Sequence, residues 1–193
     1  MITSLTPRAL FWDQRASWVG STETIEGDRF AYGALITIFG TVNGDVYVLG
    51  GQIVVDGKVN GDLIAAGGRM SVSGTIAQDL RVAGGQIAVT GAIGKNLSVA
   101  GGNVELARTG SIAGNAVAAG GNIHFAAPIK GSAKAAAGAL IISNQLGGAL
   151  DAAVGALRLT SNAEVAGGVN YYSHCEVEVE NGARIRDKLY TMP

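Results

Sequence analysis

The sequence predicts an all-β fold, a single-stranded, right-handed parallel β-helix (solenoid) with about nine rungs of about 17 residues and three short strands in each rung. The first observation is an internal repeat. The stretch from Gly44 to Asn60, GDVYVLGGQIVVDGKVN, is followed directly by GDLIAAGGRMSVSGTIA, which has the same outline. The second observation is that apolar residues and glycines keep the same positions in successive stretches. A chain with this pattern is expected to coil, with each stretch stacked on the one before it.

Apolar residues define the predicted strands of each unit. The third, fifth, tenth, twelfth and sixteenth positions of a unit are almost always apolar, as in Val46, Val48, Ile53, Val55 and Val59. Spacings of two residues are typical of strands, because alternate side chains point to one face, whereas a helix would need spacings of three and four. The repeat units begin at Gly27, Gly44, Gly61, Gln78, Lys95, Gly114, Gly131, Gly148, Gly167 and Asp187.

Glycines mark the predicted corners between these strands. A pair occupies the seventh and eighth positions, as in Gly50 and Gly51, and another glycine occupies the fourteenth, as in Gly57. Glycine tolerates positive-φ conformations, so the chain can turn there within few residues. Parallel stacking would then merge the apolar columns into one core. Right-handed coiling is favoured because parallel crossovers are nearly always right-handed and the strict hexapeptide pattern of left-handed β-helices is absent.

The predicted domain organisation is an N-terminal capping segment over residues 1–24 and one solenoid over residues 25–190. Thr6 before Pro7 is a favourable helix start, so a short helix is one form that the cap could take. Phe11, Trp12 and Trp18 are the predicted cap residues, placed over the open first rung or over an apolar patch. Such a cover is expected because an open rung exposes backbone groups that pair with other chains.

Composition excludes several classes of function. The chain has 193 residues and a formal net charge of −1, so it lacks the basic surface that nucleic-acid binding needs. Its single cysteine, Cys175, excludes an internal disulfide and a cysteine-based zinc cluster. The sequence shows neither a run of eighteen apolar residues nor the start of a secretory signal. We therefore predict no nucleic-acid partner, no small-molecule substrate and no cofactor.

The stretch GTVNGDVYVLGGQIVVDGKVNGDLIAAGG, with GGVNYYS and ENGARI near the end, resembles the bactofilins and their polymer-forming bacterial relatives, over roughly residues 24–189. The resemblance implies a β-helix that assembles end to end into nucleotide-independent polymers, often near a membrane, and has no active site. It implies a non-enzymatic scaffold whose partners are copies of itself, with a membrane or cell-envelope proteins as further candidates. The expected location is bacterial and membrane-proximal, on the cytoplasmic side if the chain is complete and in the cell envelope if an export signal was removed.

Two regions are predicted to contact other molecules. Outward positions of the first rungs hold large apolar residues, whereas later rungs hold residues such as Arg81 and Lys134 there. An exposed patch of this kind marks a partner surface, unless the N-terminal segment covers it. The C-terminal rung is the second region, since its last residues include apolar side chains and no obvious polar cap. The predicted interface residues are Phe30, Tyr32, Tyr47, Leu49, Ile64, Leu189 and Tyr190.

Other functional hypotheses are weaker. A column of acidic and amide residues at the second position could bind a cation, but we favour hydrogen bonds from these side chains to nearby backbone N–H groups, and predict no metal site. His124 and His174 are too few for a hexapeptide-repeat carbonic anhydrase, and the period disfavours a hexapeptide acyltransferase. The chain is therefore predicted not to be an enzyme; the alternatives are a solenoid binding module and a structural subunit of a larger cell-envelope complex. The column comprises Asp28, Asp45, Asp62, Asp79, Asn96 and Asn115.

Overall fold

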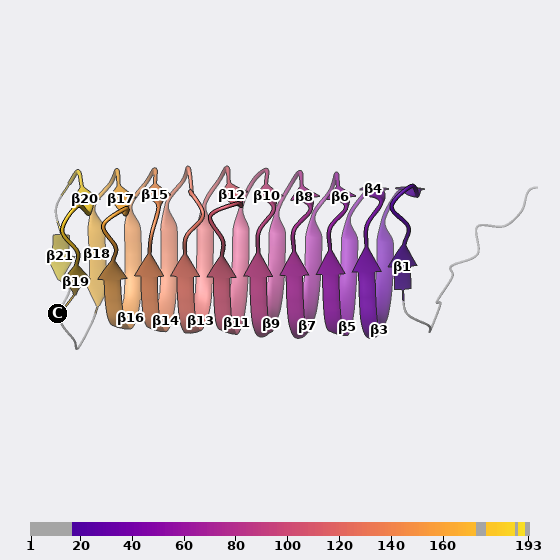
Figure 1. The fold of residues 1–193 in the computed structure, drawn as a ribbon, viewed down its shortest axis with the longest axis horizontal. Helices are drawn as coiled ribbons and strands as arrows, with labels where there is room; N and C mark the ends of the chain where they lie inside the picture. The colour runs from indigo at the N-terminus through magenta and orange to yellow at the C-terminus, as the bar shows by residue number, and fades with distance from the viewer. Residues whose placement is uncertain (1–16, 173–176, 188, 192–193) are drawn as a thin grey trace, which may run out of the picture.

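The structure is a computed structural model that describes residues 17–172, 177–187 and 189–191. Throughout these residues the chain consists of strands, turns and irregular segments and contains no helix. It winds into a straight rod, with the rungs lined up from the N-terminal to the C-terminal end (Figure 1). This arrangement confirms the predicted β-solenoid of about nine rungs.

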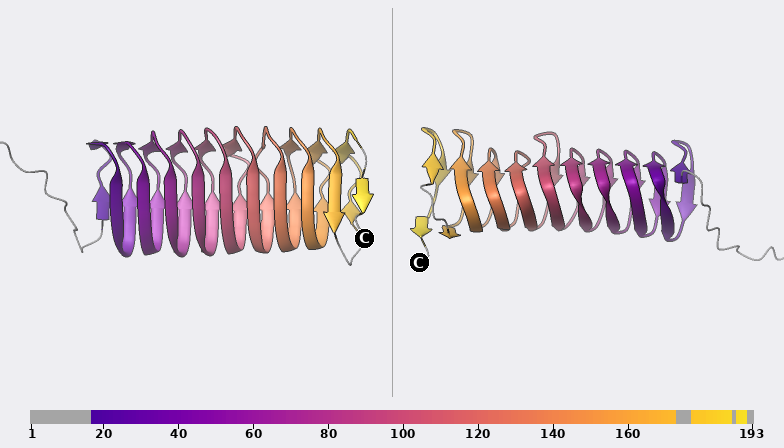
Figure 2. Two further views of the ribbon diagram at one scale, coloured as in Figure 1. Left: turned by 180° about the vertical axis from the view of Figure 1, so that it is seen from behind. Right: turned by 90° about the horizontal axis from the view of Figure 1, so that it is seen from below.

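Most rungs are built from one long strand and one short strand. A long strand has ten residues and folds back near its middle, at the seventh and eighth positions, as the U-shaped ribbons in Figure 2 show. We call its two halves the first arm and the second arm. The three segments predicted for each rung are therefore present, but the first two form one continuous strand. The long strands are β3 Arg29–Ile38, β5 Val46–Val55, β7 Leu63–Val72, β9 Leu80–Val89, β11 Leu97–Leu106, β13 Ala116–Phe125, β14 Ala133–Ile142 and β16 Leu150–Leu159.

The short strands form the remaining side of the coil. They lie above the arms in the view of Figure 1 and pair with one another in two small sheets. Isolated bridges at Ile129 link these two sheets, so the side is continuous along most of the rod. The short strands are β2 Thr24–Glu26, β4 Thr41–Asn43, β6 Lys58–Val59, β8 Thr75–Ile76, β10 Ala92–Ile93, β12 Ser111–Ile112, β15 Gln145–Leu146, β17 Glu164–Val165 and β20 Arg184–Ile185.

All neighbouring long strands pair in parallel and in register with the repeat. Val46 lies opposite Leu63, and Leu63 lies opposite Leu80, so equivalent positions of successive units stack directly. In Figure 1 each first arm descends on the far side, each second arm rises on the near side, and the chain then crosses back over the top while it advances towards its C-terminal end. This path is a right-handed coil, as predicted from the general preference of parallel crossovers.

The core consists of the five predicted apolar columns. In the unit that begins at Gly44, Val46, Val55 and Val59 are 0% exposed, Ile53 is 1% exposed and Val48 is 5% exposed. Equivalent residues in the following rungs are buried to a similar degree. The hydrophobic effect thus acts along the whole rod rather than in one central cluster, since every rung buries the same positions against its neighbours.

The glycine pairs have a different role from the one predicted. Within the described residues only Gly27 and Gly182 have a positive φ, so the fold of each long strand at Gly50 and Gly51 does not use the left-handed region. The constraint is steric. A Cβ atom added to Gly50 would lie 2.8 Å from the carbonyl oxygen of Gly33 in the rung below, which is closer than real Cβ contacts.

Strand pairing at the N-terminal end reaches into the segment predicted as a cap. Here β1 Ser17–Val19 pairs with the second arm of β3. Trp18 lies in β1, whereas Phe11, Trp12 and the predicted short helix fall outside the described residues. The C-terminal strands are β18 Val169–Tyr172, β19 Glu178–Val179 and β21 Leu189–Thr191.

Candidate functional site

The first candidate site is an apolar face on the outside of the N-terminal rungs. Phe30 pairs with Tyr47 and Tyr47 with Ile64, so these side chains stack on the outer surface of the first arms. The rings of Phe30 and Tyr47 are parallel, with centroids 4.7 Å apart. Tyr32 and Leu49 form the neighbouring column, and Phe30 and Leu49 are 62% and 64% exposed. The structure therefore brings five of the predicted interface residues together.

The apolar face extends further than predicted. The sixth position continues after Leu49 as a column of alanines on the outer surface, and Val117 in the neighbouring column is 50% exposed. A shallow groove follows these columns along the rod, from Phe30 to Tyr172. The expectation that this surface is apolar at one end only is therefore incomplete. The recurrence of alanine at one position of six successive units was the available signal. The alanines are Ala66, Ala83, Ala100, Ala119, Ala136 and Ala153.

The two predicted C-terminal interface residues lie at the opposite end of the rod. Leu189 and Tyr190 belong to β21, and the register places them opposite Val169 and Asn170 of β18. Leu189 is thus in register with Val169, whose side chain is fully buried, and Tyr190 is in register with the half-buried Asn170. The structure thus separates the predicted interface residues into a lateral face and an end.

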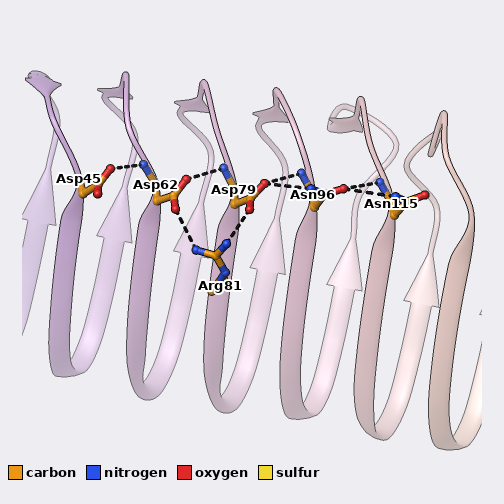
Figure 3. Close-up of polar contacts among 6 residues, drawn as sticks. All are labelled: Asp45, Asp62, Asp79, Arg81, Asn96 and Asn115. Atoms are coloured by element: carbon orange, nitrogen blue, oxygen red, sulfur yellow. Dashed lines mark hydrogen bonds and ion pairs between the residues drawn. The ribbon is translucent and has the colours of Figure 1, made fainter.

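The column of acidic and amide residues forms a hydrogen-bonded ladder at one corner of the coil (Figure 3). The Oδ1 atom of Asp45 accepts the backbone N–H of Asp62 at 2.8 Å, and Oδ1 of Asp62 accepts that of Asp79 at 3.0 Å. The ladder continues through Asn96 and Asn115 to the backbone N–H of Ser132. Each side chain therefore fixes the start of the next long strand, as the favoured prediction stated.

Charge repulsion within the ladder is reduced by one arginine. The guanidinium of Arg81 contacts Asp62 Oδ2 at 2.8 Å and Asp79 Oδ2 at 2.6 Å. The hydrogen bond from the Asp79 backbone, reinforced by Arg81, holds the pKa of the Asp62 carboxyl below its ordinary value. Beside the ladder, partial burial and the neighbouring Asp45 carboxylate raise the pKa of the Tyr47 hydroxyl, which donates to Asp45 Oδ2 at 3.4 Å.

Replacing Asp62 with asparagine should remove a pH-dependent contribution to stability. The folded-state pKa of Asp62 is lowered, so its carboxylate stabilises the fold above the unfolded-state pKa of about 3.9, and this contribution is lost as the pH falls through the folded-state pKa. Asparagine retains an Oδ1 acceptor but not the ion pair with Arg81. We expect urea unfolding to show wild type more stable than Asp62→Asn at pH 7, with the difference shrinking towards pH 3. An equal difference at both pH values would contradict this assignment.

Of the two histidines, only His124 lies in the described residues, and it lies beside a buried serine hydroxyl. His124 Nε2 lies 2.8 Å from Ser143 Oγ, a nucleophile–base distance, but Ser143 is only 5% exposed, so its hydroxyl is not accessible to a substrate. His174 lies outside the described residues. Across residues 17–172, 177–187 and 189–191, no group of three His, Cys, Asp or Glu side chains is placed to hold a metal ion.

Comparisons with known proteins assign no family. No family model, no curated protein and no solved structure matches the chain. In the described residues there is also no helix with the length and apolar character needed to cross a bilayer. Functional interpretation therefore depends on the lateral face, the side-chain ladder and the two ends of the coil.

Proposed function

We propose that this protein is a non-enzymatic structural scaffold that assembles through the ends of its solenoid into nucleotide-independent polymers. The supporting observation is the open order of the long sheet. Among the described strands, this sheet runs from β1 to β21, and each of these three-residue strands pairs with a neighbour on one side only. Edge strands of this kind present backbone groups that pair with another chain.

The regularity of the repeat supports stacking between copies. Each rung presents the same inward columns and the same hydrogen-bond register as the rung before it. A second copy placed on an end could therefore continue the apolar core and the backbone pairing with little rearrangement. The resemblance to bactofilins points to the same function, and a membrane-proximal location in a bacterium remains part of the proposal.

Negative-stain electron microscopy of the purified chain tests the proposal. Rods much longer than one molecule should form without added nucleotide, because nothing in the assembly requires an energy source. Light scattering should show a mass that rises with protein concentration. A strictly monomeric species over a wide concentration range would overturn the proposal.

A substitution at the C-terminal end gives a sharper test. Leu189→Lys places a charge at a position that is in register with the buried Val169, so it should prevent another copy from stacking on this end. We expect shorter polymers or none, with an unchanged circular-dichroism spectrum. Tyr190→Lys introduces the same charge at a position in register with the half-buried Asn170 and should reduce assembly less. Full-length polymers of Leu189→Lys would contradict the assignment of this end.

A second candidate function, a binding module with one specific partner, is favoured by the exposure of Phe30 and Leu49. Large exposed apolar patches commonly mark interaction surfaces. This candidate differs in its expected result, since it predicts a monomer that binds its partner in saturable 1:1 stoichiometry. Loss of binding in Leu49→Asp, with no change in the oligomeric state, would support it.

A further inference from the structure

We propose that the lateral face of the first arms binds the same face of a second copy whose coil axis runs in the opposite direction. This inference rests on the proposed end-to-end assembly. It adds a lateral contact, in which a second copy binds the groove along the rod. It concerns two columns of outward side chains, which we call column 4 and column 6 after their positions in the repeat unit. Column 4 comprises Phe30, Tyr47, Ile64, Arg81, Ser98, Val117, Lys134 and Asp151, and column 6 comprises Tyr32, Leu49, Ala66, Ala83, Ala100, Ala119, Ala136 and Ala153.

The distribution of side-chain volume along this face is uneven. The first two rungs carry the stacked rings of Phe30 and Tyr47 with Leu49 beside them, and these side chains project outwards. From Ala66 to Ala153 column 6 contains only methyl side chains, and the groove runs along them. The groove includes the bulky side chains of the first rungs as well as the alanines, so side-chain volume is concentrated at one end of the face and is smaller in column 6 along the rest. A face of this kind can complement itself when one copy is reversed.

Of the two face-to-face arrangements related by a two-fold axis, only the antiparallel one uses this complementarity. If two copies met with parallel axes, related by a two-fold axis along the rod, the bulky first rungs would meet each other and hold the alanine columns apart. A two-fold axis along the strand direction instead reverses the order of the rungs and places column 4 on column 4 and column 6 on column 6. The bulky first rungs of each copy then lie against the small side chains of the other, and close packing is possible along the whole face.

The chemistry of the opposed side chains fits one register. With the two-fold axis between the rungs of Ala83 and Ala100, Leu49 lies on Ala136 and Ile64 lies on Val117. Tyr47 lies opposite Lys134, and Phe30 lies opposite Asp151. Because the two rings stack on each other along the rod, their edges point towards the partner, where they meet the ion pair of Lys134 and Asp151. Tyr172, the next large side chain, falls beyond the overlap.

The surroundings of the face disfavour an anionic membrane as its occupant. The first arms begin at the acidic ladder, where Asp28, Asp45, Asp62 and Asp79 are partly compensated by Arg81. A negative rim of this kind repels anionic lipid headgroups. In the proposed pair, the acidic rims of the two copies lie along the same edge of the interface. Their carboxylates are hydrogen-bonded to backbone N–H groups and remain beside solvent.

The size of the face predicts when pairing occurs. Eight rungs at a spacing of about 4.8 Å give a length of about 38 Å, and two columns are about 10 Å wide. The pair would bury about 800 Å² in total, which is below the usual size of a stable interface. Single molecules are thus expected to pair weakly, whereas molecules joined end to end combine many such contacts. The expected species is a paired filament rather than a free dimer.

The experiment measures filament width by electron microscopy for matched variants. Wild type should form filaments two rods wide. Ala119→Arg places a charge in the exposed alanine column, so it should give single-rod filaments, whereas Ala156→Arg, an exposed alanine on the second arm of β16, should leave the paired width unchanged.

A charge-rescue variant tests the register itself. Ala66 and Ala119 lie three rungs apart in one chain, about 14 Å, where salt largely screens their interaction, but they face each other across the proposed pair. Adding Ala66→Glu to Ala119→Arg should therefore restore paired filaments. Adding Ala153→Glu instead supplies the same charge in the wrong register and should not restore them.

The possible outcomes separate the two proposals. If wild type forms only single-rod filaments, or if Ala119→Arg keeps the paired width, the lateral proposal is overturned while end-to-end assembly stands. If no filaments form at all, both proposals fail. Rescue by Ala153→Glu but not by Ala66→Glu would overturn the antiparallel register.

Discussion

Replacing Phe125 with alanine is expected to lower the free energy of unfolding by about 3–5 kcal/mol. Phe125 is 1% exposed and is the largest of the fully buried side chains. It lies in the same rung as the inward alanines Ala116 and Ala118, so its ring supplies the volume that these small residues lack. The narrow rung cannot collapse around the resulting cavity, because the backbones of the neighbouring rungs fix its dimensions.

Urea unfolding followed by circular dichroism measures this loss. Val117→Ala is the matched control, because Val117 lies in the same strand but is 50% exposed, and its truncation should change stability by no more than about 0.5 kcal/mol. Since rungs contact only their neighbours, the effect can appear as separate unfolding of the C-terminal rungs rather than as a uniform shift. Equal midpoints for wild type and Phe125→Ala would contradict the tight packing of this rung.

The apolar columns were predictable because each of them follows from one simple rule. A spacing of two residues places Val46 and Val48 on one face, and the repeat places Leu63 and Ala65 above them. All four residues are buried as expected. The side-chain ladder was predictable for a related reason, since aspartate and asparagine at corners commonly accept backbone N–H groups.

The role of the glycines and the groove depend on the distance between rungs, and they were harder to predict than the apolar columns. The sequence shows that glycine recurs at Gly50 and Gly67. It does not show whether glycine is needed there for a positive φ or for the close approach of neighbouring rungs. Likewise, the sequence shows that alanine recurs at the position of Ala100, but this column forms a groove only once the rungs are stacked. The pairing of β1 with β3 was not predicted, because β1 lies before the repeat pattern becomes regular.

Replacing Gly84 with valine should lower the free energy of unfolding by about 1–3 kcal/mol or more, since this is the usual cost of overpacking. A Cβ atom at Gly84 would collide with the carbonyl oxygen of Gly67 and lie 2.7 Å from Met70 Cε. The side chain of Met70 can move, but the carbonyl is held in the pairing of β7 with β9. Denaturant unfolding measures the loss, and Ala83→Val, at the adjacent outward position, should be nearly neutral because β-branched residues suit strands.

Asparagine at the same position distinguishes the two explanations for the glycine. If Gly84 were needed for a left-handed backbone, asparagine would be tolerated better than alanine, because it enters that region more readily. The observed backbone has no positive φ there, so the obstacle is the Cβ atom itself, which both residues carry. We therefore expect Gly84→Asn to be at least as destabilising as Gly84→Ala. A clearly milder effect of asparagine would show that conformational freedom, rather than the close stacking of rungs, requires glycine at this position.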